Sequence, residues 1–155
     1  MSVRQTLIMN FTTNKSSFDD VYNHLCSVDI DFVPPLSSTL SIDLYAEKLV
    51  SKANRCEVWI GNLLVGLIAY YNTGDGLFIS NFSVIEEHRG TGVSRLLYRY
   101  YQTVTSDVHV TTLRTSIHNV RAQKFYESIG FSVLSRFNDE IEYSTLASSN
   151  LISEF

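Results

Sequence analysis

The chain alternates between two spacings of apolar and polar residues, which predicts strands and helices in alternation. Near-continuous apolar runs, as at residues 63–71 and 77–84, are typical of buried strands. Segments that repeat apolar residues every three or four positions, the first two capped by Ser16 or Ser17 and by Ser41, are typical of amphipathic helices. We therefore expect strands at residues 5–11, 57–60, 63–71, 77–84, 108–116, 131–136 and 141–145, and helices at 17–28, 41–53, 93–104 and after 119.

This order of elements predicts an α+β fold, with a mixed, mostly antiparallel sheet of about six or seven strands flanked by about four helices. The two prolines of the loop at residues 29–40 forbid helix there and favour an extended or turning path. Neither a repeat nor a low-complexity linker divides the chain. We expect one domain over residues 1–155, with a tail at 147–155 that has no clear partner and is free to move.

Composition narrows the class of protein. With 155 residues, 45% of them hydrophobic and 18% charged, the chain is long and apolar enough to bury a core. A net charge of −4 argues against a nucleic-acid-binding protein, and apolar runs as short as 63–71 argue against a membrane protein. Without a signal-like N-terminus, we expect a cytoplasmic protein. We expect Cys26 and Cys56 to be buried free thiols, and no Cys/His cluster has the spacing of a metal site.

The segment His88–Leu97 carries the first chemical signal, because a glycine-rich turn here follows an apolar strand and opens a helix. Backbone N–H groups at a helix N-terminus lack intrahelical partners and the helix dipole adds positive charge, so the turn suits a phosphate or pyrophosphate. Gly90 and Gly92 let the backbone approach such a ligand closely. Alone, the pattern is equally typical of a tight strand-to-helix connection.

A second signal lies at Asn119–Phe131, which has the pattern of a strand end, a short helix and a stop. Asn119 is a favourable N-cap, and Ala122, Phe125 and Ile129 lie on one face at helical spacing. Taken alone, these features are equally typical of an ordinary amphipathic helix.

Together, in this order and at this separation, the two segments resemble the Gcn5-related N-acetyltransferase (GNAT) superfamily. In that family a strand leads into R/Q-x-x-G-x-G/A, which binds the pyrophosphate of acetyl-coenzyme A, and a later N-x-x-A-x-x-[FY]-Y-x-x-x-G-F segment completes the site. Here the first motif is Arg89–Ser94, with Ser94 where the family usually has Gly or Ala, and the second matches at every fixed position. The resemblance implies a GNAT-like fold, acetyl-CoA as co-substrate and no metal. It also implies cofactor contacts from Phe82, Val84, Arg89, Gly90, Thr91, Gly92, Val93, Ser94, Asn119, Ala122 and Tyr126.

The same resemblance implies direct attack of a primary amine on the acetyl thioester. Tyr126 matches the family's tyrosine, and a phenol stays protonated at neutral pH while it can donate to the departing thiolate. With nine tyrosines in the chain, a packing role for Tyr126 is the other interpretation. A backbone N–H near Val84 would hold the thioester oxygen if the strand bulges there as in relatives.

The group that removes the proton from the amine is less defined. His118 is our first candidate for a catalytic base, because an imidazole titrates near neutrality. Glu86, Glu87 and His88 lie near the same motifs, and a water relay without a single base is an equal alternative.

The acceptor class stays open between an amino sugar, an amino acid, a polyamine and similar small amines. Relatives that acetylate protein N-termini place a glutamate on the strand before the second motif, where this chain has Arg114, which argues against that class. We expect a monomer or homodimer that binds neither nucleic acid nor membranes. Two other functions are kept: a non-catalytic acyl-CoA sensor or regulatory module, and a structural domain that binds no coenzyme A.

Overall fold

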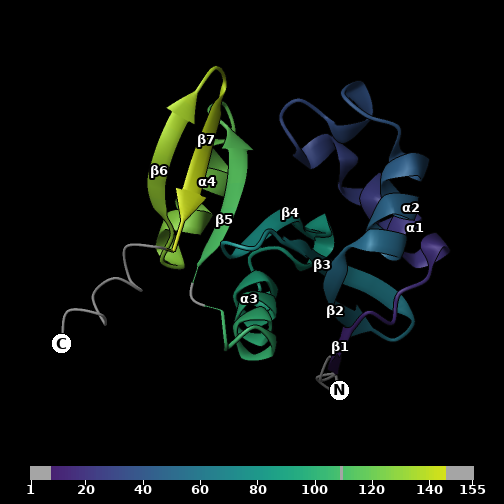
Figure 1. The fold of residues 1–155 in the computed structure, drawn as a ribbon. Helices are drawn as coiled ribbons and strands as arrows, with labels where there is room; N and C mark the ends of the chain where they lie inside the picture. The colour runs from purple at the N-terminus through teal and green to yellow at the C-terminus, as the bar shows by residue number, and fades with distance from the viewer. Residues whose placement is uncertain (1–7, 109, 146–155) are drawn as a thin grey trace, which may run out of the picture.

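The computed structural model describes residues 8–108 and 110–145, and among them it has seven strands in one sheet and four α-helices (Figure 1). The strand order is β1-β2-β3-β4-β5-β7-β6, and only β4 and β5 are parallel. In chain order the elements are β1 (Met9–Thr13), α1 (Phe18–Val28), the 3-10 turns η1 (Asp29–Asp31) and η2 (Leu36–Ser38), α2 (Ile42–Lys52), β2 (Asn54–Ile60), β3 (Leu63–Asn72), β4 (Leu77–Val84), the 3-10 turn η3 (Glu86–His88), α3 (Val93–Val104), β5 (Thr111–Ser116), α4 (Val120–Ser128), β6 (Ser132–Phe137) and β7 (Glu140–Ser144).

The predicted fold class is confirmed, and the expected elements are found with ends that differ by a few residues. Part of the first expected strand, at residues 5–7, and the expected tail at 147–155 lie outside the described residues. The loop at 29–40 holds two 3-10 turns, because its prolines exclude an α-helix but leave room for a three-residue turn on either side.

One expectation about the cysteines is wrong. Cys56 is buried on β2, but Cys26 is exposed. The buried positions of α1 are Val21, His24, Leu25 and Val28, and residue 26 falls outside that face of the helix.

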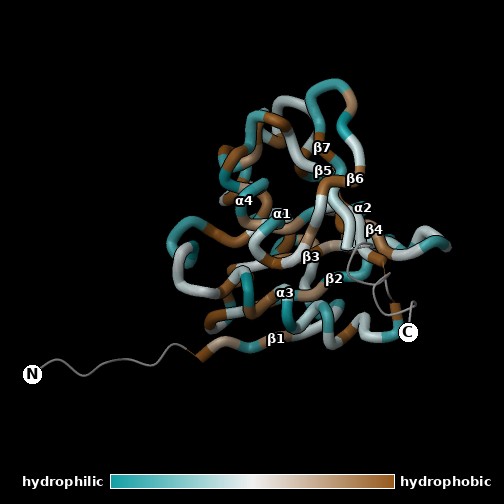
Figure 2. Tube along the Cα trace, turned by 90° about the vertical axis from the view of Figure 1, so that its left-hand side faces the viewer, coloured by the Kyte–Doolittle hydropathy of each residue, from teal (hydrophilic) through white to brown (hydrophobic). Residues whose placement is uncertain are grey.

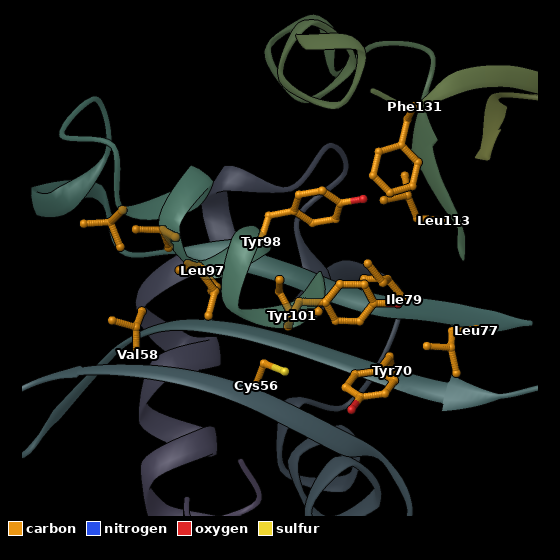
Figure 3. Close-up of a cluster of buried hydrophobic side chains, with 14 of the residues drawn as sticks. Cys56, Val58, Tyr70, Leu77, Ile79, Leu97, Tyr98, Tyr101, Leu113 and Phe131 are labelled. Atoms are coloured by element: carbon orange, nitrogen blue, oxygen red, sulfur yellow. The ribbon is translucent and has the colours of Figure 1, made fainter. Parts of the chain in front are cut away.

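Helices cover both faces of the sheet. The α1 and α2 helices pack together on one face, where Leu25 and Leu49 meet Leu67 of β3 in a fully buried cluster. The α3 helix covers the other face, and Figure 3 shows its Leu97 and Tyr101 above the central strands. Figure 2 shows how apolar and polar stretches alternate along the chain, as this two-sided packing requires.

A buried carboxylate ties the start of α1 to the sheet. The Glu57 side chain is fully buried on β2 and accepts hydrogen bonds from the Thr12 hydroxyl at 2.6 Å, from the Lys15 and Ser16 backbone N–H groups at 2.9 and 2.8 Å, and from the Ser16 hydroxyl. Arg55 Nε lies 3.4 Å from it. Because its oxygens are so fully engaged, this charge can stay inside the protein and fix the turn between β1 and α1.

The parallel pairing between β4 and β5 is short. It joins Leu77 to Thr111, Phe78 to Thr112 and Ile79 to Leu113, and then ends. Beyond these three pairs β4 continues to Val84 along β3, while β5 continues along β7. The two strands therefore diverge beside the turn that leads into α3.

Candidate functional site

A cavity of about 710 Å³ lies where β4 and β5 diverge. Its wall is built from both strands, the glycine-rich turn before α3, α4 and the loop between α1 and α2. The predicted site residues in this wall are Phe82, Val84, Arg89, Gly90, Ser94, Asn119, Ala122 and Tyr126. The structure thus brings both sequence motifs to one cavity.

Three residues of the first motif shape the turn instead of lining the cavity. Gly92 is the N-cap of α3 with φ 91°, a backbone conformation that favours glycine. The Thr91 hydroxyl donates to the His88 carbonyl at 2.5 Å, and Val93 is buried in the core. Gly90, with φ 79°, does line the cavity, and a Cβ added there would meet no protein atom within 4 Å.

The second motif places α4 as expected. Asn119 Oδ1 accepts a hydrogen bond from the Ala122 backbone N–H at 3.1 Å, so the predicted N-cap is confirmed. Contact of Asn119 with a cofactor stays a prediction. His118, our first candidate base, has an exposed side chain and lies outside the cavity wall.

Tyr126 lies in the cavity wall among aromatic rings, with Phe82, Phe131 and Tyr143 each 6.0 Å away between ring centroids. Burial raises the pKa of Tyr126 above its ordinary value, so the phenol stays protonated at neutral pH. Within the described part of the chain, its hydroxyl has no hydrogen-bond partner. The ring therefore has a packing role, and its O–H remains available to a ligand.

The β4 bulge lies at Ser80, not near Val84. Ala69 pairs with Asn81 and Tyr70 pairs with Ile79, which leaves Ser80 without a partner on β3. The register from Asn81 to Val84 is regular. The bulge follows directly on Ile79, the last residue of β4 that pairs with β5, so an unpaired backbone position opens where the strands diverge.

An ion pair joins the glycine-rich turn to the loop between α1 and α2. Arg89 Nη2 lies 3.2 Å from Asp31 Oδ1, and both residues line the cavity. Among the described residues, Arg89 Nε and Nη1 and Asp31 Oδ2 are buried without a hydrogen-bond partner. Arg89 therefore keeps donor capacity that the ion pair does not use.

A buried histidine fixes the hydroxyl of Ser83, another residue of the cavity wall. His24 Nδ1 lies 3.0 Å from the Leu64 carbonyl and Nε2 lies 2.9 Å from Ser83 Oγ. Burial lowers the pKa of His24 to about 4, so the ring is neutral and carries one N–H. A carbonyl can only accept, which places that hydrogen on Nδ1 and makes Nε2 the acceptor of the Ser83 proton.

The side chain of Asn81 then takes a defined orientation. The oxygen of the Asn81 amide faces Ser83 Oγ at 2.7 Å, and the amide nitrogen has no hydrogen-bond partner among the described residues. Because the Ser83 proton already goes to His24, the hydrogen bonds are satisfied when the oxygen and nitrogen of the Asn81 amide are exchanged, so that its NH2 group donates to Ser83. Ser83 consequently offers the cavity an oxygen lone pair and no proton.

The described residues contain neither a membrane-spanning helix nor a cluster of metal ligands. None of their helices is long and apolar enough to cross a membrane. None of their His, Cys, Asp and Glu side chains gather in groups of three or more that could hold a metal ion.

Sequence and structure comparisons identify the class of protein. Residues 54–133 match the family model of the acetyltransferase (GNAT) domain, which is about half of the chain and spans both motifs. The chain belongs to the GNAT acetyltransferase family. A search of curated proteins gave no match.

Solved structures share this fold at low sequence identity. The PaiA N-acetyltransferase of Thermoplasma acidophilum, in complex with coenzyme A, has 13% identity and a TM-score of 0.70 over 87% of this chain and 98% of that chain. A GNAT-family acetyltransferase of Staphylococcus aureus Mu50 has 14% identity and a TM-score of 0.71 over 88% and 98%. The ribosomal-protein-S18-alanine N-acetyltransferase of Escherichia coli has 15% identity and a TM-score of 0.68 over 88% and 92%.

The environment of His24 makes a prediction about stability and pH. Its pKa is about 4 in the folded protein against an ordinary value of 6.5, so below pH 6.5 the unfolded chain binds a proton that the folded protein does not. Stability should therefore fall between pH 6.5 and 4, by on the order of 3 kcal/mol from this residue. His24→Gln should remove this part of the pH dependence in urea unfolding curves.

His118→Gln is the matched control, because that side chain is exposed. It should leave the pH dependence of the wild-type protein unchanged. A His24→Gln variant that loses stability on acidification as steeply as the wild type would contradict a buried, neutral His24.

Proposed function

We propose that this protein transfers the acetyl group of acetyl-CoA to a primary amine of a small molecule, by direct attack of the amine on the thioester. The observation that carries the proposal is one cavity whose wall holds residues of both sequence motifs together with the loop between α1 and α2. Such a cavity can receive a cofactor and an acceptor together at the gap between β4 and β5. The cytoplasm, where acetyl-CoA is available, is the location that we expect.

The residues of the first motif fit the phosphates of coenzyme A. The α3 N-terminus carries no side-chain cap, so its first N–H groups can meet an anion. Gly90 leaves open space above the turn, and two buried guanidinium nitrogens of Arg89, Nε and Nη1, have no hydrogen-bond partner among the described residues. Ser94, the departure from the family pattern, lines the cavity and can donate its hydroxyl to a phosphate.

The chain's own residues supply the groups that acyl transfer requires. Acetyl-CoA, when bound, supplies a thioester whose acyl carbon accepts the amine. The bulge at Ser80 offers a backbone N–H to the oxygen that gains negative charge. Tyr126 donates its proton to the thiolate as the C–S bond breaks, while water takes the proton that the amine loses when the N–C bond forms and returns one to Tyr126.

Release of free thiol from acetyl-CoA in the presence of a pool of primary amines tests the proposed function. We expect thiol release that depends on the amine and exceeds hydrolysis without it. Calorimetric binding of acetyl-CoA without any amine-dependent thiol release would favour a sensor or regulatory module, and the absence of binding would favour a structural domain.

A second prediction concerns cofactor binding at the glycine-rich turn. Gly90→Val should weaken calorimetric binding of coenzyme A by about tenfold or more, because the new side chain fills the space that a pyrophosphate needs. Gly74→Val is the matched control: Gly74 also has positive φ and an open Cβ position, but it lies in the turn between β3 and β4.

The two variants bear the same kind of backbone strain, about 1–2 kcal/mol for a side chain in the left-handed region. Their folding stabilities should therefore fall by similar amounts, while only Gly90→Val loses affinity. Equal affinities for the two variants would remove the turn from the cofactor site.

A third prediction concerns the proton donor. Tyr126→Phe keeps the ring contacts and should leave the affinity for acetyl-CoA unchanged, while it lowers kcat by about a hundredfold, the scale of one general acid. The loss should shrink with acetyl thioesters of more acidic thiols, since a better leaving group needs less help. A variant with wild-type kcat would reduce Tyr126 to a packing residue.

A further inference from the structure

A pair of hydroxyl groups lies at the β4 bulge, on the sheet face opposite Tyr126. Tyr126 packs against Phe82 in the cluster covered by α3, whereas Tyr45 belongs to α2 and packs in the cluster on the other face. The Tyr45 hydroxyl lies 2.6 Å from Ser80 Oγ and also donates to the Ser80 carbonyl at 3.2 Å. Both Tyr45 and Ser80 line the cavity.

The hydrogens and lone pairs of the Tyr45 and Ser80 hydroxyl groups determine what this pair can offer to a ligand. The two hydroxyl groups together have two hydrogens and four lone pairs. Each hydrogen is donated either to the other hydroxyl of the pair, or to a backbone carbonyl or a ligand. Burial raises the pKa of Tyr45 to about 12, so it is a neutral phenol at physiological pH. The Tyr45–Ser80 pair therefore presents an uncharged acceptor oxygen to the cavity.

The wall around the pair is mostly apolar on the side of the loop between α1 and α2. Phe32, Pro34, Leu36 and Leu40 line the cavity there, and the carboxylate on this side, Asp31, is already engaged by Arg89. The other wall carboxylates, Asp139 and Glu140, come from the β6–β7 hairpin across β5. An apolar wall with neutral hydroxyls disfavours a charged ammonium and favours an uncharged amine on an apolar body.

We propose that Tyr45 and Ser80 bind and orient the attacking amino group of an acceptor with an apolar body. The proposal rests on the proposed function, because it assigns the acceptor side of the same site. The amine donates an N–H to the Ser80 oxygen, which leaves its lone pair free to point toward the acyl carbon at the bulge. As the N–C bond forms and the C–S bond breaks, the proton that the amine loses passes to water, and the thiolate takes a proton from Tyr126, which regains one from water.

The first test compares acceptors with the wild-type protein. We expect 2-phenylethylamine, an apolar monoamine, to give a kcat/KM for thiol release at least about tenfold above those of spermidine and glucosamine, since a tenfold ratio corresponds to the burial of about two methylene groups. A preference for spermidine or glucosamine would overturn the assignment of an apolar acceptor.

The second test removes the hydroxyls one at a time with 2-phenylethylamine as the probe. Tyr45→Phe and Ser80→Ala should each raise KM for the amine and lower kcat/KM by about tenfold, the scale of one lost hydrogen bond, while calorimetric Kd for acetyl-CoA is unchanged. Unlike the effect of Tyr126→Phe, this loss should not shrink with more acidic thiols, because the hydroxyl pair acts on the amine and not on the leaving group.

Tyr71→Phe is the matched control. Tyr71 lies on β3, its hydroxyl is buried without a hydrogen-bond partner among the described residues, and it is not in the cavity wall. Its substitution should leave KM, kcat and acetyl-CoA affinity unchanged.

The outcomes separate the two proposals. Wild-type kcat/KM in Tyr45→Phe and Ser80→Ala, in a protein that releases thiol, would overturn the role of the hydroxyl pair and keep the proposed function. No thiol release from the wild-type protein with any amine, despite binding of acetyl-CoA, would overturn the proposed function itself. A parallel loss in Tyr71→Phe would point to a general packing effect and also overturn the role of the pair.

Discussion

The site depends on where the parallel ladder between β4 and β5 stops. Three residue pairs hold the strands together, and the last of them joins Ile79 to Leu113. If the ladder ran on, the backbone groups of residues 80–84 would pair with β5 at about 4.8 Å and no cavity could form between the strands. The open wall and the approach to the α3 N-terminus follow from this early end, and the bulge at Ser80, in the pairing with β3, lies directly beyond it.

Two other interactions keep the strands apart beyond that point. β5 pairs with β7 through its other edge from Thr112 to Ser116, so beyond Leu113 it follows β7 and not β4. On the face covered by α3, the rings of Phe82, Tyr126 and Phe131 pack together between β4 and α4. Rings of this size bury much apolar surface and leave a stiff wall, which holds the gap open without a ligand.

Local signals predicted the elements well. The N-cap residues Ser17 and Asn119 and the helix from Val93 to Val104 are found as expected, because caps and apolar spacing act within a few residues. The site could be predicted only as far as two motifs indicated it. Gly90 and Ser94 were assigned by pattern, but the bulge was expected near Val84, since its position depends on how β4 meets two neighbouring strands.

The rest of the site depends on contacts between residues that lie far apart in the sequence. Arg89 meets Asp31 and Ser83 meets His24 across more than fifty residues of sequence, and neither partner can be read from its own neighbours. One signal was present: polar residues interrupt the otherwise apolar strand β4, and His24 interrupts the apolar stripe of α1. Such breaks in a pattern mark places where a polar group must find a buried partner.

Because of these polar positions, the two faces of β4 carry different chemical groups. Ser83 contacts His24 and Asn81, and Ser80 contacts Tyr45, while Phe82 packs in the aromatic cluster with Tyr126. Apolar residues of similar volume at the polar positions would avoid the cost of burying hydroxyl and amide groups. A sheet built for stability alone would therefore not keep them. With them, β4 carries hydroxyl and amide groups on the face covered by α1 and α2, where the bulge at Ser80 lies, and on the other face the ring that packs against Tyr126.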